Sequence, residues 1–117
     1  MTIKREALNT MDFSDIATGR KLAPVHPGEV LVRDFIEANG ITRYRVAKAM
    51  SVPQRRVDEI CAGNRAISAD TALRLERVFG MDAQVWLNLQ ARYDLETATR
   101  SLKKRIEREA KPLEAVM

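Results

Sequence analysis

The twenty residues from Arg43 to Ala62 have the spacing of two short helices that cross steeply over a tight turn. In such a pair the fifth residue must be small, because the second helix crosses directly over it, and here it is Ala47. Apolar residues stand where the pair must pack against the rest of a domain: Val46, Met50, Val52, Val57 and Ile60. The pattern predicts a helix-turn-helix, with an ordinary hairpin of two bundle helices as the alternative.

Start and stop signals on both sides of this pair predict more helices and no strand. Pro27 suits the first position of a helix, where its missing N–H is not needed, and Gly40 is a left-handed stop. Thr42, Ser68 and Asp82 are favourable N-caps. We expect five helices, over about 26–39, 42–50, 53–63, 68–80 and from 82 onward.

Length and composition fit one all-α domain with an extension at each end. The chain has 117 residues, of which 45% are hydrophobic and only 5% aromatic, enough for one modest core. We expect an N-terminal arm over 1–25, the helix-turn-helix domain over 26–94 and a helical extension over 95–117. No apolar run approaches the roughly 18 residues that span a bilayer, and no secretion signal is recognisable, so we expect a cytoplasmic protein.

Positive charge concentrates on the predicted helix-turn-helix. The chain has a formal net charge of +4, and residues 43–65 alone carry six basic and two acidic side chains. A local excess of this kind is typical of a nucleic-acid surface. The second helix of such a pair lies in the major groove of DNA. The side chains that project outward from it are therefore predicted to read bases: Gln54, Arg55, Asp58 and Glu59.

Each predicted contact follows from the donors and acceptors of the side chain. Arg55 has two donors for O6 and N7 of guanine, Gln54 can bond adenine in the same way, and Asp58 or Glu59 can accept from cytosine N4. Side chains beside the base-reading face are predicted to contact phosphates, with a base contact as the alternative for Arg56: Thr42, Arg43, Arg56, Asn64 and Arg65. For each arginine taken alone, a solvated surface charge is the alternative.

The last helix has two apolar stripes. Val85, Trp86, Leu89 and Tyr93 are predicted to close the core. If the helix continues beyond Asp94, a second seam follows along Leu87, Ala91, Leu95, Ala98, Leu102 and Ile106. A nearly continuous seam must be covered, and we expect it to form the interface of a homodimer. The alternative is a tail that folds back on its own core. The basic side chains of the tail are interpreted as a solvated helix face.

Several motifs in one order resemble the HigA-type antitoxins. They are residues 26–29 (HPGE), 52–53 (VP), 67–75 (ISADTALRL), 86–90 (WLNLQ) and 93–95 (YDL). The resemblance covers about residues 24–95 and implies a five-helix, lambda-repressor-like (XRE) domain. It also implies a dimer that binds palindromic operator DNA, represses its own operon and silences a HigB-type toxin, a ribosome-dependent mRNA endonuclease of the RelE-like class. One departure is Ser51, where many helix-turn-helix sequences have glycine.

Other chemistry finds little support in the sequence. His26 and Cys61 lack metal-ligand spacing and no glycine-rich phosphate loop occurs, so we expect no enzyme, metal, cofactor or small-molecule ligand. Phe13 and Ile16 in the arm are our first candidates for toxin contact. A stand-alone XRE-type repressor without a toxin is the alternative function, and an inhibitor with a vestigial helix-turn-helix is a third. A toxin-sized neighbouring reading frame would favour the antitoxin.

Overall fold

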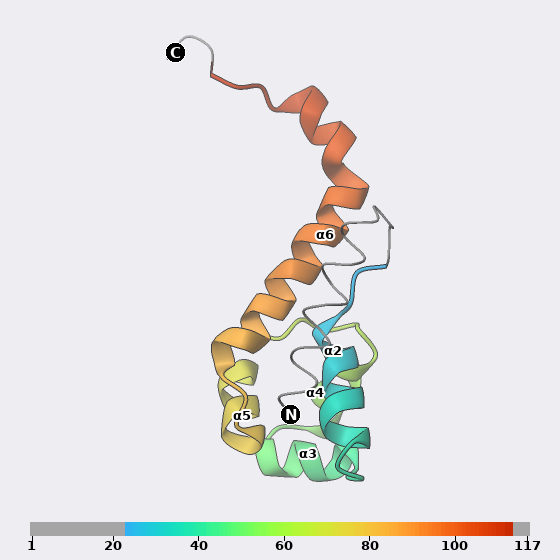
Figure 1. Cartoon of the computed structure of the whole chain (residues 1–117), viewed down its shortest axis with the longest axis vertical. Coiled ribbons are helices and arrows are strands. Elements are labelled where there is room, and N and C mark those ends of the chain that lie inside the picture. Colours follow the sequence, from blue (N-terminus) through green and yellow to red (C-terminus); the bar gives the residue numbers. More distant parts are fainter. Residues whose placement is uncertain (1–22, 114–117) are drawn as a thin grey trace.

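The computed structural model describes residues 23–113, which form a helical body with one long helix projecting from it (Figure 1). The chain passes in order through α2 (Pro27–Val30), η1 (Leu31–Glu37), α3 (Arg43–Met50), α4 (Gln54–Cys61), α5 (Ala69–Phe79) and α6 (Ala83–Glu109). Because α2 and η1 form one continuous run, the described residues contain five helices in series and no strand. The predicted all-α, five-helix fold is confirmed.

The first helical run begins and ends where the sequence predicts. The Nδ1 atom of His26 accepts a hydrogen bond of 2.9 Å from the Gly28 N–H and so caps α2. Gly28 is required by close packing, because a Cβ at this position would overlap the carbonyl oxygen of Ile60 in α4. The run ends at Glu37, and the turn that follows it reaches Gly40, whose φ of 61° is the left-handed conformation that glycine adopts without strain.

α3 and α4 cross over a tight turn, with Ala47 buried at the crossing. Ser51 has a left-handed φ of 60°, which brings the Val52 N–H to the Ala47 carbonyl at 3.0 Å. α4 begins at Gln54, so Pro53 is the N-cap residue of this helix and not its first residue as predicted. The difference arises because Pro53 has an extended ψ of 144°, and it leaves the direction of α4 unchanged.

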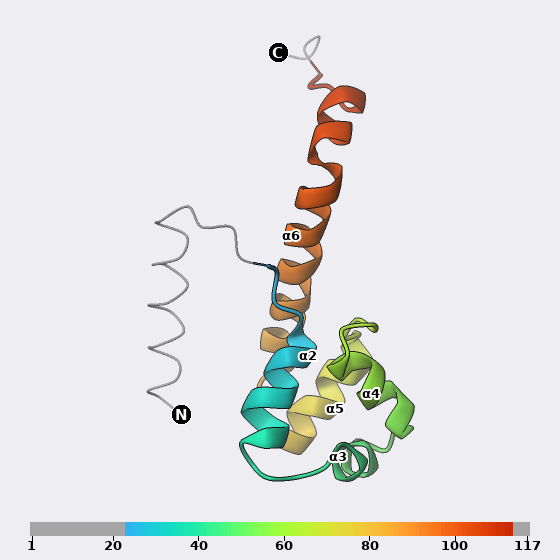
Figure 2. The ribbon, with the colours of Figure 1, turned by 90° about the vertical axis from the view of Figure 1, so that its right-hand side faces the viewer.

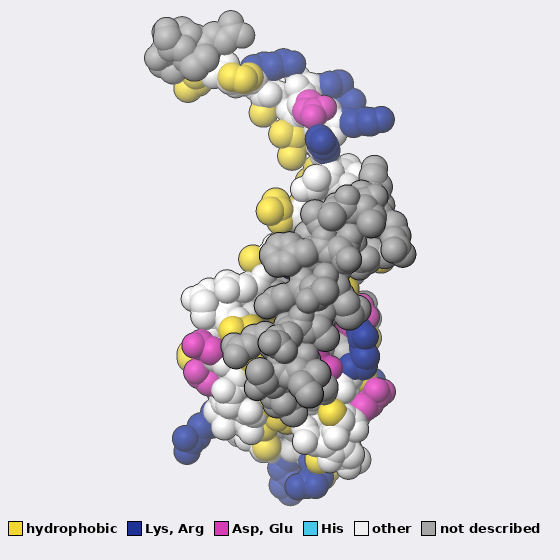
Figure 3. All heavy atoms as spheres, viewed as in Figure 1, with side chains coloured by type: hydrophobic (Ala, Val, Ile, Leu, Met, Phe, Trp, Pro, Cys, Tyr) yellow, Lys and Arg dark blue, Asp and Glu magenta, His cyan; other side chains and the backbone are white. Residues whose placement is uncertain are grey.

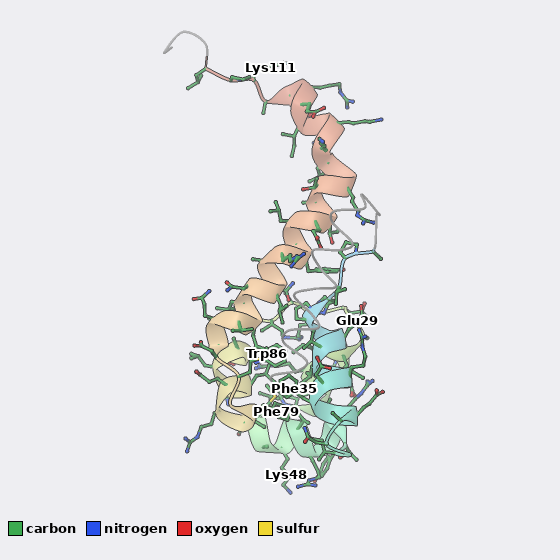
Figure 4. The ribbon with its side chains drawn as sticks, in the orientation of Figure 1. Glu29, Phe35, Lys48, Phe79, Trp86 and Lys111 are labelled. Carbon is green, nitrogen blue, oxygen red and sulfur yellow. The ribbon has the colours of Figure 1, made fainter. Side chains whose placement is uncertain are left out.

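The core lies where α2–η1, α5 and the beginning of α6 meet. Leu31, Leu75 and Trp86 are fully buried there. Figure 4 shows Phe35, Phe79 and Trp86 together inside the body. The ring centroids of Phe35 and Phe79 are 4.9 Å apart, and those of Phe35 and Trp86 are 5.3 Å apart. These aromatic contacts join η1 to α5 and to the beginning of α6.

α6 meets the core along an edge close to the predicted one, since Leu89 packs against the core and Tyr93 contacts the buried His26. Trp86 and Gln90 are buried and Leu87 packs against the core, whereas Val85 is 42% exposed. The prediction that Val85 closes the core is therefore wrong, and the prediction for Trp86 is confirmed. α6 packs against both α5 and α2, so the edge through Trp86 and Gln90 faces inward. Val85 precedes Trp86 by one residue, which rotates its side chain by about 100° around the helix and away from the core.

The second half of α6 extends away from the body as a continuous helix (Figures 1 and 2). The helix therefore does continue beyond Asp94, and the alternative in which the tail folds back on its own core is wrong. Leu95 and Ile106 on this half are 69% and 51% exposed. None of the helices between residues 23 and 113 combines the length and apolarity needed to cross a membrane.

Candidate nucleic-acid interface

α4 carries two faces with opposite character. Val57 and Ile60 are fully buried and fix the helix on the core. Gln54 is exposed, and the side chain of Arg55 is 86% exposed. Figure 2 shows α3 and α4 together on one outer side of the body. The beginning of α4 therefore presents an amide and a guanidinium to solvent, as the sequence predicts.

α3 presents its N-terminus beside α4. The Oγ1 atom of Thr42 accepts a hydrogen bond of 3.1 Å from the Arg45 N–H, which caps the helix. The first residue of the helix, Arg43, lies with its Nη1 atom 3.8 Å from Oδ1 of Asp58 in α4. This ion pair joins the two helices. Asp58, which the sequence predicts to read a base, therefore also binds an arginine of α3.

Glu59 holds two arginines at once. One carboxylate oxygen lies 3.0 Å from Nε of Arg55, one turn earlier in α4, and the other lies 2.8 Å from Nε of Arg65 in the following loop. Hydrogen bonds from both arginines, with that from Arg65 the larger cause, lower the pKa of the Glu59 carboxyl, so it stays ionised. The structure thus brings together a predicted base-reading arginine and a predicted phosphate-binding arginine.

Arg56 is tethered to the neighbouring helix. Its Nη1 atom lies 3.1 Å from Oδ2 of Asp70 in α5, and the same oxygen accepts from Nε of Arg74 at 3.0 Å. Arg74 also donates to the carbonyl of Met50, the last residue of α3, at 2.8 Å. The hydrogen bond from Arg74 is the main cause that lowers the pKa of Asp70. Sequence reasoning missed this network, in which Asp70 and Arg74 tie both helices of the pair to α5.

The loop after α4 is held from the other side by α6. Its Ile67 N–H donates to Oε1 of the buried Gln90 at 2.8 Å. His26 is also buried here, with its ring 4.8 Å from that of Tyr93 in an edge-to-face contact. Burial lowers the pKa of His26, against the charge of Asp94 and a backbone hydrogen bond to Arg65, which raise it. Sequence reasoning had no signal for the role of Gln90, because its partner lies 23 residues away.

Further basic side chains extend the surface past α4 along α3. Figure 3 shows Lys and Arg side chains at the α3 end of the body, where Figure 4 labels Lys48. The Nζ atom of Lys48 lies 3.5 Å from the hydroxyl of Tyr44, whose side chain is 56% exposed. Neither residue was singled out from the sequence, although their spacing of one helical turn is a recognisable signal.

Comparison with known proteins identifies the family of this arrangement. The helix-turn-helix family model matches residues 32–86, which include α3 and α4. Virulence-associated protein I of Dichelobacter nodosus is 46% identical over 84 residues, which are 71% of this chain and 78% of that protein. An addiction module antidote protein of the HigA family from Coxiella burnetii is 41% identical, with a TM-score of 0.73 over 78% of this chain and 99% of the other. The chain belongs to the HigA family of antitoxins.

A second related structure was solved together with DNA. The antitoxin HigA of Pseudomonas aeruginosa, solved with the higBA promoter, is 43% identical with a TM-score of 0.74, over 77% of this chain and 98% of the other. The resemblance that the sequence motifs indicated is therefore confirmed. In this HigA-type chain, all the predicted DNA contacts lie inside the matched segment 32–86.

The apolar seam of this HigA-type chain lies beyond that segment. Leu87 packs partly against the core, Ala98 is half-buried, and Leu95 and Leu102 are 69% and 37% exposed. Figure 3 shows hydrophobic side chains along one side of the projecting half of α6 and Lys and Arg side chains along another. The sequence-predicted seam therefore exists as a face of one continuous helix.

Proposed function

We propose that this HigA-type chain is an antitoxin that binds operator DNA through α3 and α4 and represses its own operon. The observation that carries the proposal is the outward face of α4, where Gln54 and the highly exposed Arg55 stand on a helix anchored by Val57 and Ile60. The P. aeruginosa HigA that was solved with a promoter supports it, since its backbone resembles this one over nearly its whole length.

In the proposed complex the beginning of α4 enters the major groove. Gln54 and Arg55 read adenine and guanine, and Asp58 and Glu59 are placed to accept from cytosine or to orient the arginines that they already hold. Specific affinity then comes from few base contacts, while the flanking basic residues supply the general attraction for DNA.

Phosphates are bound on both sides of the groove in this proposal. The N-terminus of α3 at Thr42 and Arg43 faces one backbone, and the loop with Asn64 and Arg65 faces the other. Arg56 is held by Asp70, so it contributes to phosphate binding only by sharing that carboxylate or exchanging it. Its larger role in this proposal is to fix the angle between α4 and α5.

The chain acts as a homodimer in the same proposal. The seam of α6 would pair with the seam of a second copy and cover side chains that are exposed or half-buried in one protomer: Leu87, Ala91, Leu95, Ala98 and Leu102. A two-fold dimer would place two copies of α4 about one turn of DNA apart, which requires a palindromic operator. The proposed toxin partner is of the HigB type. Phe13 and Ile16, the predicted toxin contacts, lie outside the described residues.

The test is a footprint on the DNA upstream of the protein's own reading frame. We expect protection of two symmetric half-sites with centres about 10 base pairs apart. Arg55→Ala should weaken this protection by roughly 1–3 kcal/mol of binding free energy while retaining weak binding to any duplex. Absence of a protected site with the wild-type protein would refute autorepression.

Co-expression with the neighbouring reading frame separates the antitoxin from a stand-alone repressor. A toxin-sized product that co-purifies and inhibits translation only when released would support the antitoxin function. A protected operator with no such partner would instead favour the repressor without a toxin.

A further inference from the structure

Four arginines of the helix-turn-helix and the loop after it are paired with carboxylates. Arg43 lies against Asp58, Arg56 against Asp70, and both Arg55 and Arg65 against Glu59. Glu59 differs from the other carboxylates because both of the arginines that it holds are proposed to touch DNA, one at a base and one at a phosphate. Its side chain is only 29% exposed, so it lies beneath these two more exposed guanidinium groups.

The geometry of the Arg55 contact leaves that side chain able to read a base. Glu59 occupies the Nε donor of Arg55, and the two terminal Nη groups carry the other donors of the guanidinium. A long side chain with 86% exposure would otherwise sample many rotamers. A contact one turn along the same helix limits these rotamers before DNA arrives, which lowers the entropy lost when Arg55 pairs with guanine.

The charge of Glu59 acts differently on phosphates. Unpaired arginines attract the backbone of any DNA sequence, and this attraction dominates non-specific binding. A carboxylate shared by Arg55 and Arg65 neutralises part of their charge and repels a phosphate that approaches either of them. Since the pKa of Glu59 is lowered by the same arginines, this negative charge persists at neutral pH.

We propose that Glu59 is a positioning and specificity residue, which aims Arg55 at bases and weakens the hold of Arg55 and Arg65 on non-specific phosphates. The inference rests on the proposed function, in which α4 enters the major groove. It replaces the role predicted from the sequence, where Glu59 itself reads cytosine. Glu59 therefore raises specificity by lowering affinity for the wrong sequences.

The experiment compares Glu59→Gln with the wild-type protein on two duplexes. One is a sequence that the wild-type protein enriches from a random pool, and the other is its scrambled version. Glu59→Gln keeps the side-chain size and removes the charge. Glu109→Gln is the matched control, because Glu109 pairs with Arg105 at the same spacing and a similar distance of 3.1 Å, at the far end of α6.

We expect Glu59→Gln to bind the scrambled duplex roughly 5- to 10-fold more tightly and the enriched duplex less than about 2-fold more tightly. The slope of log affinity against log salt should steepen by about 0.9 for each phosphate newly contacted. Glu109→Gln should leave the ratio between the two duplexes unchanged. In an Arg55→Gln background, Glu59→Gln should reduce discrimination less than in the wild-type protein, because only Arg65 then remains to be released from the carboxylate.

Several results would overturn the proposal. In one such result, Glu59→Gln would have the same affinities as the Glu109→Gln control on both duplexes. In another, it would lower the affinity for both duplexes by the same factor, which would indicate a purely structural role. Glu59→Asp keeps the charge and should retain the wild-type slope of log affinity against log salt. A steeper slope in this variant would also contradict the proposal. If the wild-type protein enriches no sequence, the proposed function fails and the inference with it. If the wild-type preference survives Glu59→Gln intact, only the inference fails.

Discussion

Replacing Ser51 with glycine should stabilise the protein. Ser51 is the only non-glycine residue with positive φ among residues 23–113, while Gly40 and Gly63 end the neighbouring helical segments in the same left-handed conformation. A residue with a Cβ pays about 1–2 kcal/mol in this conformation. Glycine loses roughly 0.5–1 kcal/mol more backbone entropy on folding. The difference predicts a gain of about 0.5–1 kcal/mol for Ser51→Gly.

Urea denaturation at a fixed protein concentration measures this gain. The midpoint for Ser51→Gly should rise with an unchanged slope, because the same surface is exposed on unfolding. Ala49→Gly is the matched control, since Ala49 is an exposed residue in the regular part of α3 and its replacement should cost about 1 kcal/mol. DNA affinity should not change in Ser51→Gly, because the turn keeps its shape. A midpoint that falls in both variants would refute the assignment of strain to Ser51.

Three further predictions concern DNA contact, assembly and pH. Arg55→Ala should lose roughly 1–3 kcal/mol of operator binding and relax specificity at one base pair, whereas Arg43→Ala should weaken all duplexes about equally; titrations on operator and scrambled DNA decide. If the seam of α6 forms the proposed homodimer, Leu102→Glu should give a monomer in light scattering, because each copy would bury a carboxylate in the interface, while Lys103→Glu should stay dimeric. The pKa of His26 is lowered chiefly by burial, so the stability of the folded state should be full above pH 6.5 and fall as the pH drops below it. The urea midpoint measures this loss, which should be absent from His26→Asn.

Local signals in the sequence predict the helix ends well. Thr42, Ser68 and Asp82 each accept a hydrogen bond from a backbone N–H of the helix that they precede. Such contacts join residues two or three positions apart, so they depend little on the rest of the fold. The left-handed turn at Ser51 is predictable for the same reason.

Contacts between distant elements are harder to predict. The edge of α6 that faces the core is decided by the helices that it meets, and Leu87 takes the position expected of Val85. The pairing of Arg56 with Asp70 spans 14 residues and exists only because α4 lies against α5. By contrast, the pairing of Arg55 with Glu59 has the spacing of one helical turn, and attention to that spacing would have found it.

Gly28→Ala should disturb the position of α4 itself. A Cβ on Gly28 would overlap the carbonyl oxygen of Ile60, and this oxygen also accepts the Gly63 N–H at 3.0 Å at the end of α4. Because the obstructing atom belongs to the backbone, α2 and α4 must separate. Overpacking of this kind typically costs 1–3 kcal/mol, and we expect roughly 3 kcal/mol here. The loop that carries Arg65 should move with the helix end, so operator affinity should fall together with the denaturation midpoint.

Gly40→Ala separates this steric effect from the general cost of replacing a glycine. Gly40 has a φ of 61°, and a Cβ on this residue would meet no atom within 4 Å, so alanine there should cost only about 1–2 kcal/mol. Its effect should be confined to stability, because the end of η1 lies outside the proposed DNA contacts. If Gly28→Ala lowered the midpoint no more than Gly40→Ala and left operator affinity intact, the contact between α2 and α4 would not be what positions the DNA-reading helix.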